Sequence, residues 1–206
     1  MTGRGPAPGR AGAVGGLLGP AGFVGAWVVG GATKAGYSPF NDAISRLAAV
    51  GASTRPLMSA GFVCFGVGLP CYGWALRARL GGPAWLTAVG TGLATLAVAA
   101  VPLGMSRAGD LAHGTLATAG YVTLAATPLL AAGPLRAAGR RRAAAWSVAA
   151  GLGCGVCLAA TTLGRHHGFW QRAGLSVGDV WLAVSAAAML RGVTLSDAPA
   201  VASPAV

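Results

Sequence analysis

Residues 143–163 read AAAWSVAAGLGCGVCLAATTL, a run without a charged side chain that directly follows Arg140, Arg141 and Arg142. An α-helix rises about 1.5 Å per residue, so roughly 20 apolar residues cross the ~30 Å hydrocarbon core of a bilayer. Arginines gathered at one end of such a run are typical of the cytoplasmic end of a membrane helix. This stretch therefore predicts a transmembrane helix that begins on the cytoplasmic side.

The rest of the chain repeats this pattern. Of its 206 residues, 54% are hydrophobic and only 9% are charged, against roughly 25% charged in an average soluble domain. This composition excludes an ordinary soluble enzyme, and the longest connection, 33–55, is too short for a separate soluble domain. We predict an all-α, polytopic membrane bundle of six transmembrane helices, near Ala13–Ala32, Pro56–Ala75, Pro83–Leu103, Leu111–Ala131, Ala143–Leu163 and Val177–Met189.

The net charge of +11 comes from 15 Lys and Arg residues against four acids. The basic residues stand singly or in short groups between apolar runs, which argues against nucleic-acid binding. Over short loops, the side richer in Lys and Arg is cytoplasmic. We therefore predict that both termini are cytoplasmic, in an inner or plasma membrane. The richer side has Arg4, Arg10, Arg77, Arg79, Arg136, Arg140, Arg141, Arg142 and Arg191, and the other has Lys34, Arg46, Arg55, Arg107, Arg165 and Arg172.

Composition divides the chain into three parts. Residues 1–12 form a short cytoplasmic tail, and residues 13–195 form the transmembrane domain. Residues 196–206, rich in Ala, Pro and Ser, are expected to be disordered. The sequence contains no motif for a nucleotide, haem or flavin, so we predict no organic cofactor.

The polar residues suited to chemistry fall almost entirely on the outer side of the predicted bundle. Three of the four acids and all three histidines lie there, whereas the cytoplasmic side holds arginines and Asp197. Ionisable residues within a membrane domain are functional candidates by default. The outer-rim candidates are Asn41, Asp42, Ser45, Arg46, Asp110, His113, His166, His167, Gln171, Arg172 and Asp179.

The first outer segment, residues 37–49, is expected to contain a short helix at the membrane interface. Asn41 or Asp42 can cap it, since short polar side chains accept hydrogen bonds from free backbone N–H groups. Asp42 and Arg46 are four residues apart, in the favourable order for an ion pair, and Ser45 lies one turn from Asp42. These residues either contribute to a site or form only a cap and a surface salt bridge.

In the second outer segment, we expect Asp110 to be the N-cap of the fourth membrane helix, with His113 on the same face. A carboxylate next to an imidazole orients the ring and raises its basicity. His113 is therefore a candidate functional residue. The alternative is a buried structural hydrogen bond from His113 to Asp42 or Ser45.

The third outer segment, residues 165–174, is predicted to be a loop that carries His166, His167, Gln171 and Arg172, with Asp179 at the head of the last helix. His113, one of the two loop histidines and either Asp42 or Asp110 would give two imidazoles and one carboxylate, a ligand set suited to zinc. No zinc spacing motif such as His-Glu-x-x-His is present, so the zinc hypothesis requires the fold to bring these separate segments together.

The four cysteines lie within predicted helices. Cys154 and Cys157 have the spacing of a redox motif, but a thiolate is disfavoured in hydrocarbon. We expect all four to be small packing residues. A disulfide between Cys64 and Cys154 is the alternative, because the two share a depth.

Several short motifs resemble a known bacterial family. They are Tyr37-Ser38-Pro39 with Asn41, then Ile44-Ser45-x-Leu47-Ala48-Ala49, then His113 at a helix head, and finally Gly168-x-x-Gln171-Arg172. This arrangement resembles the six-span membrane family called domain of unknown function 998, over nearly the whole chain. The Ile-Ser-x-Leu segment is also distantly similar to the Frag1 and DRAM membrane families. The resemblance implies the fold, with Asn41, Ile44, Ser45, Leu47, His113 and Arg172 as the matching residues, and it implies no reaction.

Two positions depart from the family pattern. Arg46 and Gln171 stand where such proteins often have an acid. Both changes remove negative charge from the outer rim, which weighs against a cation-binding or proton-relay role.

Three functions remain open on the sequence alone. The first is a structural or accessory membrane protein that binds lipid, a membrane-protein partner or a second copy of itself. The second is a membrane-embedded enzyme, in the simplest case a metal-dependent hydrolase, that acts on lipid with Asp42, Ser45, Asp110 and His113. The third is a small-solute transporter, which needs ionisable groups at mid-depth, whereas the predicted interior offers mostly Thr, Ser and Cys. The enzyme and structural hypotheses both expect these four residues to converge.

Overall fold

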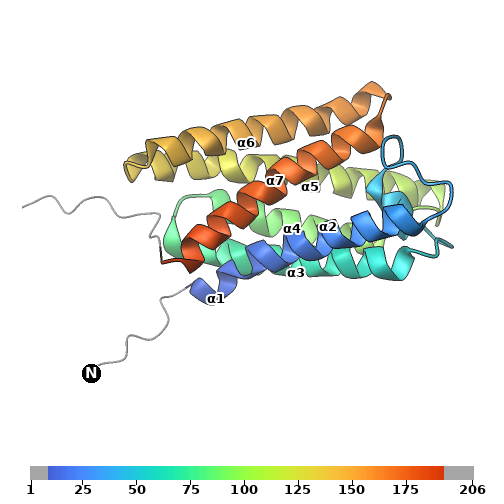
Figure 1. Ribbon diagram of the computed structural model, residues 1–206, viewed down its shortest axis with the longest axis horizontal. Helices are drawn as coiled ribbons and strands as arrows, with labels where there is room; N and C mark the ends of the chain where they lie inside the picture. The colour runs from blue at the N-terminus through green and yellow to red at the C-terminus, as the bar shows by residue number, and fades with distance from the viewer. Residues whose placement is uncertain (1–8, 193–206) are drawn as a thin grey trace, which may run out of the picture.

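The computed structural model describes residues 9–192, and it is built from helices with no strand in that range (Figure 1). The predicted disordered tail, 196–206, and most of the predicted N-terminal tail lie outside the described residues. The all-α class predicted from hydropathy is confirmed. The elements are α1 (Arg10–Ala13), α2 (Gly15–Thr33), η1 (Ile44–Ala48), α3 (Arg55–Arg79), α4 (Ala84–Ala100), α5 (Arg107–Ala137), α6 (Arg141–Ala160), η2 (Thr161–Leu163) and α7 (His167–Leu190).

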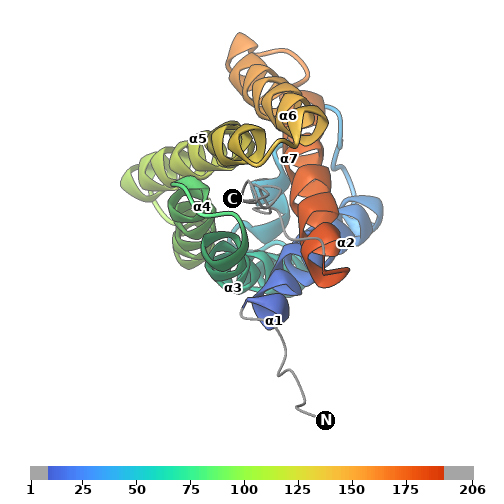
Figure 2. The ribbon, with the colours of Figure 1, turned by 90° about the vertical axis from the view of Figure 1, so that its left-hand side faces the viewer.

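The helices from α2 to α7 run up and down along one long axis and surround a common centre (Figures 1 and 2). Each packs on the next along the chain, and α7 returns to pack on α2. Glycines allow neighbouring helices to approach each other most closely. A Cβ on Gly15 of α2 would lie 2.1 Å from the carbonyl oxygen of Gly68 on α3, so a larger residue would force these helices apart. Small residues at helix contacts are the usual means by which membrane helices approach closely.

Five helical stretches are long and apolar enough to cross a membrane: Arg10–Thr33, Arg55–Arg79, Arg107–Ala137, Arg141–Leu163 and His167–Leu190. The remaining helix, α4, is apolar but has only 17 residues. It ends at Ala100 and not at the predicted Leu103. Val101 precedes Pro102, and a residue before proline is pushed out of the helical conformation.

The last helix is much longer than predicted. It begins at His167, whereas apolarity alone places its start at Val177. The residues between include Gln171 and Arg172, which are polar yet buried. Hydropathy therefore misplaces the boundary, and the predicted loop 165–174 is mostly helix.

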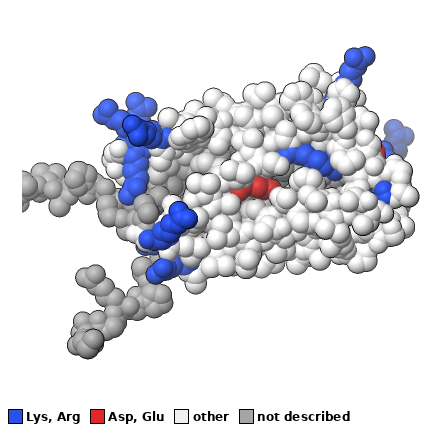
Figure 3. Space-filling model, in the orientation of Figure 1, with Lys and Arg blue, Asp and Glu red and all other residues white. Residues whose placement is uncertain are grey.

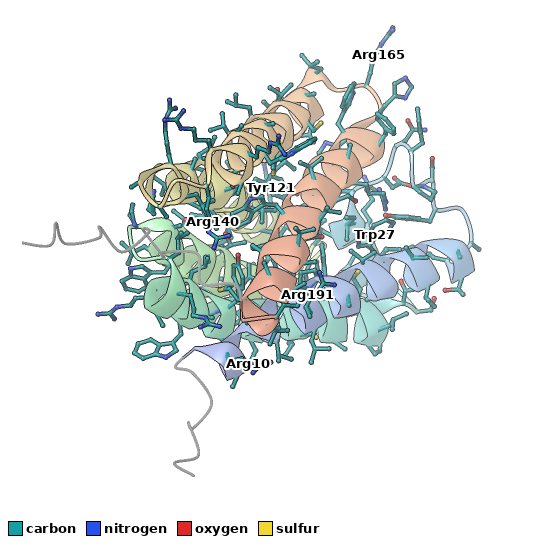
Figure 4. The ribbon with its side chains drawn as sticks, turned by 60° about the vertical axis from the view of Figure 1, so that its left-hand side comes forward. Arg10, Trp27, Tyr121, Arg140, Arg165 and Arg191 are labelled. Atoms are coloured by element: carbon teal, nitrogen blue, oxygen red, sulfur yellow. The ribbon has the colours of Figure 1, made fainter. Side chains whose placement is uncertain are left out.

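The charged residues separate the molecule into two ends. We call the end where α3, α5 and α7 finish the arginine-rich end, and the opposite end, formed by residues 34–54, 101–106 and 161–166, the loop end. Lys and Arg gather at the first and are fewer at the second, with a mostly uncharged band between them (Figure 3). Arg10, Arg140 and Arg191 lie at the arginine-rich end, whereas Arg165 points away from the bundle at the loop end (Figure 4).

The long connection between α2 and α3 folds back over the loop end. We call residues 34–54 the cap. Its short helix is of the 3-10 type, and Ile44 and Leu47 are almost completely buried against the bundle. Ala43 occupies its N-cap position and no side chain caps it, so the prediction that Asn41 or Asp42 caps this helix is wrong.

Candidate functional site

Arg172 holds the cap in place from the first turns of α7. Its Nη1 donates to the carbonyl oxygens of Pro39 at 2.7 Å, Asp42 at 3.1 Å and Gly168 at 3.0 Å. Its Nη2 donates to the Tyr37 hydroxyl. The side chain is buried, at 9% exposure. Arg172 therefore joins the cap to α7 and is not the loop residue that the sequence predicts.

Two aromatic rings enclose this guanidinium. Its carbon lies 5.3 Å from the centre of the Trp27 ring and 5.5 Å from that of Tyr37, within the range of a cation–π contact. Burial raises the pKa of the Tyr37 hydroxyl, and the neighbouring Arg172 opposes that rise. The hydroxyl thus keeps its proton and donates it to the backbone oxygens of Asp42 and Ala43.

Gly168 lets the cap approach α7. A Cβ on this residue would lie 2.5 Å from the Asp42 carbonyl oxygen and 2.6 Å from that of Pro39. The motif Gly168-x-x-Gln171-Arg172 thus packs directly on the Tyr37-Ser38-Pro39 motif. Two of the segments that carry the family resemblance therefore contact each other directly.

Gln171 connects the cap to the interior of the bundle. Its Oε1 accepts a hydrogen bond from the Ile44 backbone N–H at 2.8 Å, and its Nε2 donates to the Tyr121 hydroxyl. Tyr121 lies on α5, two helical turns after His113 (Figure 4). The sequence reasoning missed Tyr121, although its spacing of eight residues from His113 places both on one helix face.

The polar groups of Asp42 and its neighbours form hydrogen bonds and an ion pair with one another within the cap. The Asp42 carboxylate accepts from the Ser38 backbone N–H at 2.8 Å and pairs with Arg46 at 3.6 Å, so the predicted ion pair is confirmed. Asn41 hydrogen-bonds to the Ser38 hydroxyl. The structural alternative for this segment, a helix cap plus a surface salt bridge, is therefore correct for the salt bridge and wrong for the helix cap.

Asp110 also has a local structural role. The N-cap of α5 is Ser106, whose hydroxyl accepts from the Gly109 N–H at 3.0 Å, so the prediction that Asp110 is the N-cap is wrong. Ser106 occupies the N-cap position because α5 begins at the next residue, Arg107, and not at Leu111 as predicted. The Asp110 carboxylate instead accepts from the Gly104 N–H at 2.8 Å.

His113 has no carboxylate partner, contrary to the prediction. Its Nδ1 lies 2.6 Å from the Val101 carbonyl oxygen. The alternative of a hydrogen bond to Asp42 or Ser45 is also wrong, because Nδ1 bonds to the Val101 carbonyl, which Pro102 keeps out of the α4 helix. Its Nε2 is buried without a hydrogen-bond partner, and the residue is 3% exposed.

His113 lines a groove of about 750 Å³ between α5 and α6. At the loop end of the molecule, residues of the cap and of the start of α7 also line this groove. The groove extends along α5 from His113 to Leu129, about 24 Å at the helical rise. Its polar lining residues lie towards the loop end: Ser45, His113, Thr118, Tyr121, Thr161, Thr162, His167 and Gln171. Further along, the lining is apolar, with Val122, Ala125, Ala126, Leu129, Gly155 and Leu158.

A second, much smaller cavity of about 50 Å³ lies among α2, α3, α4, α5 and α7 beneath η1. Four residues line both spaces: Ser45, Ala117, Tyr121 and Gln171. The Gln171–Tyr121 hydrogen bond therefore belongs to the wall between the groove and this cavity.

Two of the four rim residues predicted to converge line one groove, and the other two do not. Ser45 and His113 line the same groove, and Ser45 is buried at 7% exposure. Asp42 and Asp110 do not line it, because backbone N–H groups elsewhere hold their carboxylates. The enzyme hypothesis thus keeps a serine and a histidine and loses both acids.

The two loop histidines do not join His113 in a metal site. His166 is exposed and stacks edge-on against Phe40, at 4.4 Å between ring centres. His167 Nδ1 lies 3.2 Å from the Thr161 carbonyl oxygen. Within residues 9–192, no three His, Cys, Asp or Glu side chains gather as a zinc site requires.

Asp179 lies in the middle of α7 and not on the outer rim. Because α7 starts at His167, Asp179 is about 18 Å along it. It is 4% exposed, and neither carboxylate oxygen has a hydrogen-bond partner. This ionisable group at mid-depth contradicts the expectation that the interior offers mostly Thr, Ser and Cys.

All four cysteines are free, so the alternative of a Cys64–Cys154 disulfide is wrong. Cys64 Sγ donates to the Leu18 carbonyl oxygen at 3.3 Å, and Cys154 is completely buried. These two have the predicted packing role, whereas Cys71 is exposed and Cys157 is partly buried.

A family model described as a protein of unknown function (DUF998) matches residues 17–188, most of the chain. No curated protein and no solved structure matches the chain significantly. The matched range includes the cap, the groove and Asp179.

Proposed function

We propose that this chain, which belongs to the DUF998 family, is a multi-pass protein of a bacterial cell membrane that binds lipid in the α5–α6 groove. In this arrangement α2 to α7 all cross the bilayer and both termini are cytoplasmic. The positive-inside rule supports the orientation, because Arg136, Arg140, Arg141 and Arg142 flank one short connection at the arginine-rich end.

The polarity gradient along the groove carries the lipid proposal. Hydroxyl, amide and imidazole groups lie towards the loop end, and aliphatic side chains line the remainder. A long-chain amphiphile has the same division, with its headgroup at the interface and its chain in hydrocarbon. Sites for small molecules are typically mostly apolar with a few placed polar groups.

The orientation is tested with reporter fusions. A reporter that is active only in the cytoplasm should be active after residue 139 and at the C-terminus, and inactive within the cap. An active fusion in the cap would overturn the proposed topology.

Lipid binding is tested by filling the groove. Gly155 lines the groove, and a Cβ there meets only Ala125, at 3.7 Å. Gly155→Leu should therefore fold normally but lose bound lipid, measured as copurified lipid per protein by mass spectrometry. Gly25→Leu is the matched control, because Gly25 lies on α2 outside the groove with nothing within 4 Å of its Cβ position. Equal lipid loss in both variants would contradict binding in the groove.

A lipid-modifying enzyme is the second candidate, and one observation favours it. His113, whose Nε2 has no partner, lines the same groove as Ser45, and nucleophilic catalysis uses histidine together with serine. The test is turnover of lipid by the purified protein in vesicles. Activity that survives in Ser45→Ala would remove this candidate, since Ser45 supplies its nucleophile.

A further inference from the structure

The hydrogen bond to Val101 determines which nitrogen of His113 carries the proton. A carbonyl oxygen only accepts, so Nδ1 must donate across the 2.6 Å contact. In the neutral imidazole, Nε2 then has a lone pair and no proton. The groove is therefore lined by a buried hydrogen-bond acceptor.

The backbone fixes this acceptor in place. Val101 follows the last residue of α4 and has φ −118° and ψ 75°, and Pro102 prevents the helix from continuing. Its carbonyl thus stays free of the α4 hydrogen-bond ladder and points to His113. The ring is held by a rigid backbone group and not by a mobile side chain.

Nothing in the described part of the chain satisfies Nε2. Buried polar groups in native proteins almost always have a partner, and those without one call for an explanation. The titratable side chains that line the groove are His113, Tyr121 and His167, and no Asp or Glu does so. Neither Tyr121 nor His167 makes a hydrogen bond to Nε2, so a bound molecule is the remaining source of a donor.

The charges around the groove restrict the chemistry of that donor. A protonated amine carries donors, but it needs a carboxylate, and the carboxylates of Asp42 and Asp110 are held by Ser38 and Gly104. A carboxylate or phosphate diester has no proton to give. A hydroxyl donates without a charge, and it suits a site that also contains Ser45, Thr161 and Gln171.

We infer that the groove selects a lipid whose headgroup presents a free hydroxyl, of the acylglycerol type, and that this hydroxyl donates to His113 Nε2. The inference rests on the proposed lipid-binding function and adds the headgroup class. The acyl chain then lies along Val122, Ala125 and Leu129, below the histidine.

Binding of two oleate esters that differ only in the alcohol part tests the inference. Purified protein is titrated with 1-monooleoylglycerol and with methyl oleate, which has the same chain and no hydroxyl, and occupancy is measured by native mass spectrometry. We expect about tenfold tighter binding of the hydroxyl lipid, the order expected for one buried hydrogen bond. Equal binding of the two would overturn the selectivity and leave lipid binding intact. Binding of neither would overturn the proposed function itself.

His113→Asn separates the two nitrogens of the ring. The asparagine amide nitrogen reaches the Nδ1 position and keeps the bond to Val101, but the side chain has no group at the Nε2 position. The variant should still bind methyl oleate and lose the preference for 1-monooleoylglycerol. A retained preference would exclude His113 as the acceptor. The comparison of the two lipids on the unmodified chain needs no variant and decides the selectivity even if His113→Asn fails to fold.

Discussion

The cap and the groove differ in how their polar groups are satisfied. At the cap, Arg172 Nη1 faces three backbone oxygens, although the Nε of the same side chain has no partner. Asp42 has both a backbone donor and an ion-pair partner. In the groove, His113 Nε2 is buried without a partner. The two regions lie next to each other. Ser45 belongs to both, and Gln171 lines the groove and accepts a hydrogen bond from Ile44 of the cap. Under the proposed function, the cap provides stability and the groove provides binding, and substitutions can test the two separately.

Arg172→Ala should have the largest effect on the cap. It removes the shared donor of three carbonyl groups and the cation between Trp27 and Tyr37. Buried groups left without partners cost about 1–3 kcal/mol each, so we expect a loss of about 3 kcal/mol or more, measured by thermal unfolding in detergent. Arg172→Lys should not restore stability, because an ammonium does not reproduce the planar fork of donors. A stable Arg172→Lys protein would contradict this account of the cap.

Gly168→Ala should weaken the same contact through sterics alone. The added Cβ would lie 2.5 Å from the Asp42 oxygen, and overpacking of this kind costs about 1–3 kcal/mol. The control is Gly114→Ala on α5, where nothing lies within 4 Å of the Cβ position. That variant should be neutral or slightly more stable, since alanine favours helix over glycine. Equal losses in the two variants would show that the cap is not the cause.

Asp179→Leu extends the comparison to a third region. The Asp179 carboxylate is buried and unsatisfied, like His113 Nε2, but it lines none of the pockets described for residues 9–192. Replacing an unpartnered polar group with an aliphatic one should stabilise the protein by about 1–2 kcal/mol. Thermal unfolding measures the change, with lipid occupancy expected to stay constant. A loss of stability would mean that Asp179 has a partner, which would favour the transport hypothesis.

Arg46→Ala should have the smallest effect. Its side chain is 66% exposed, and it pairs with Asp42 at 3.6 Å. Exposed ion pairs contribute about 0–1 kcal/mol, so the unfolding midpoint should hardly move. A loss comparable to that of Arg172→Ala would show that the cap depends on surface charge and not on buried hydrogen bonds.

Hydropathy predicts the helices well because a long apolar run has few alternatives to a membrane helix. It fails where polar residues are buried by tertiary contacts, as at Gln171 and Arg172, whose partners in the cap lie more than 120 residues away in sequence. That single error shifts the start of α7 and places Asp179 on the rim.

The candidate site, too, is predictable only where the interacting groups form a recognisable local pattern in the sequence. Charge patterns predict the Asp42–Arg46 pair because its members are one helical turn apart. They do not predict the Val101 carbonyl as the partner of His113, since no sequence pattern marks a backbone oxygen freed by the proline after it. Residue types identify His113 as a candidate, and only the fold identifies its partner.

The short α4 also has a consequence for the surrounding lipid. Its 17 residues span about 25 Å, less than the ~30 Å hydrocarbon core, while the 25 residues of α3 beside it span more. If α4 crosses the bilayer with its neighbours, the leaflets must thin beside it, and hydrophobic mismatch of this kind costs fractions of a kcal/mol per Å. The protein should therefore partition preferentially into bilayers with shorter acyl chains, and its distribution between membranes would depend on their thickness.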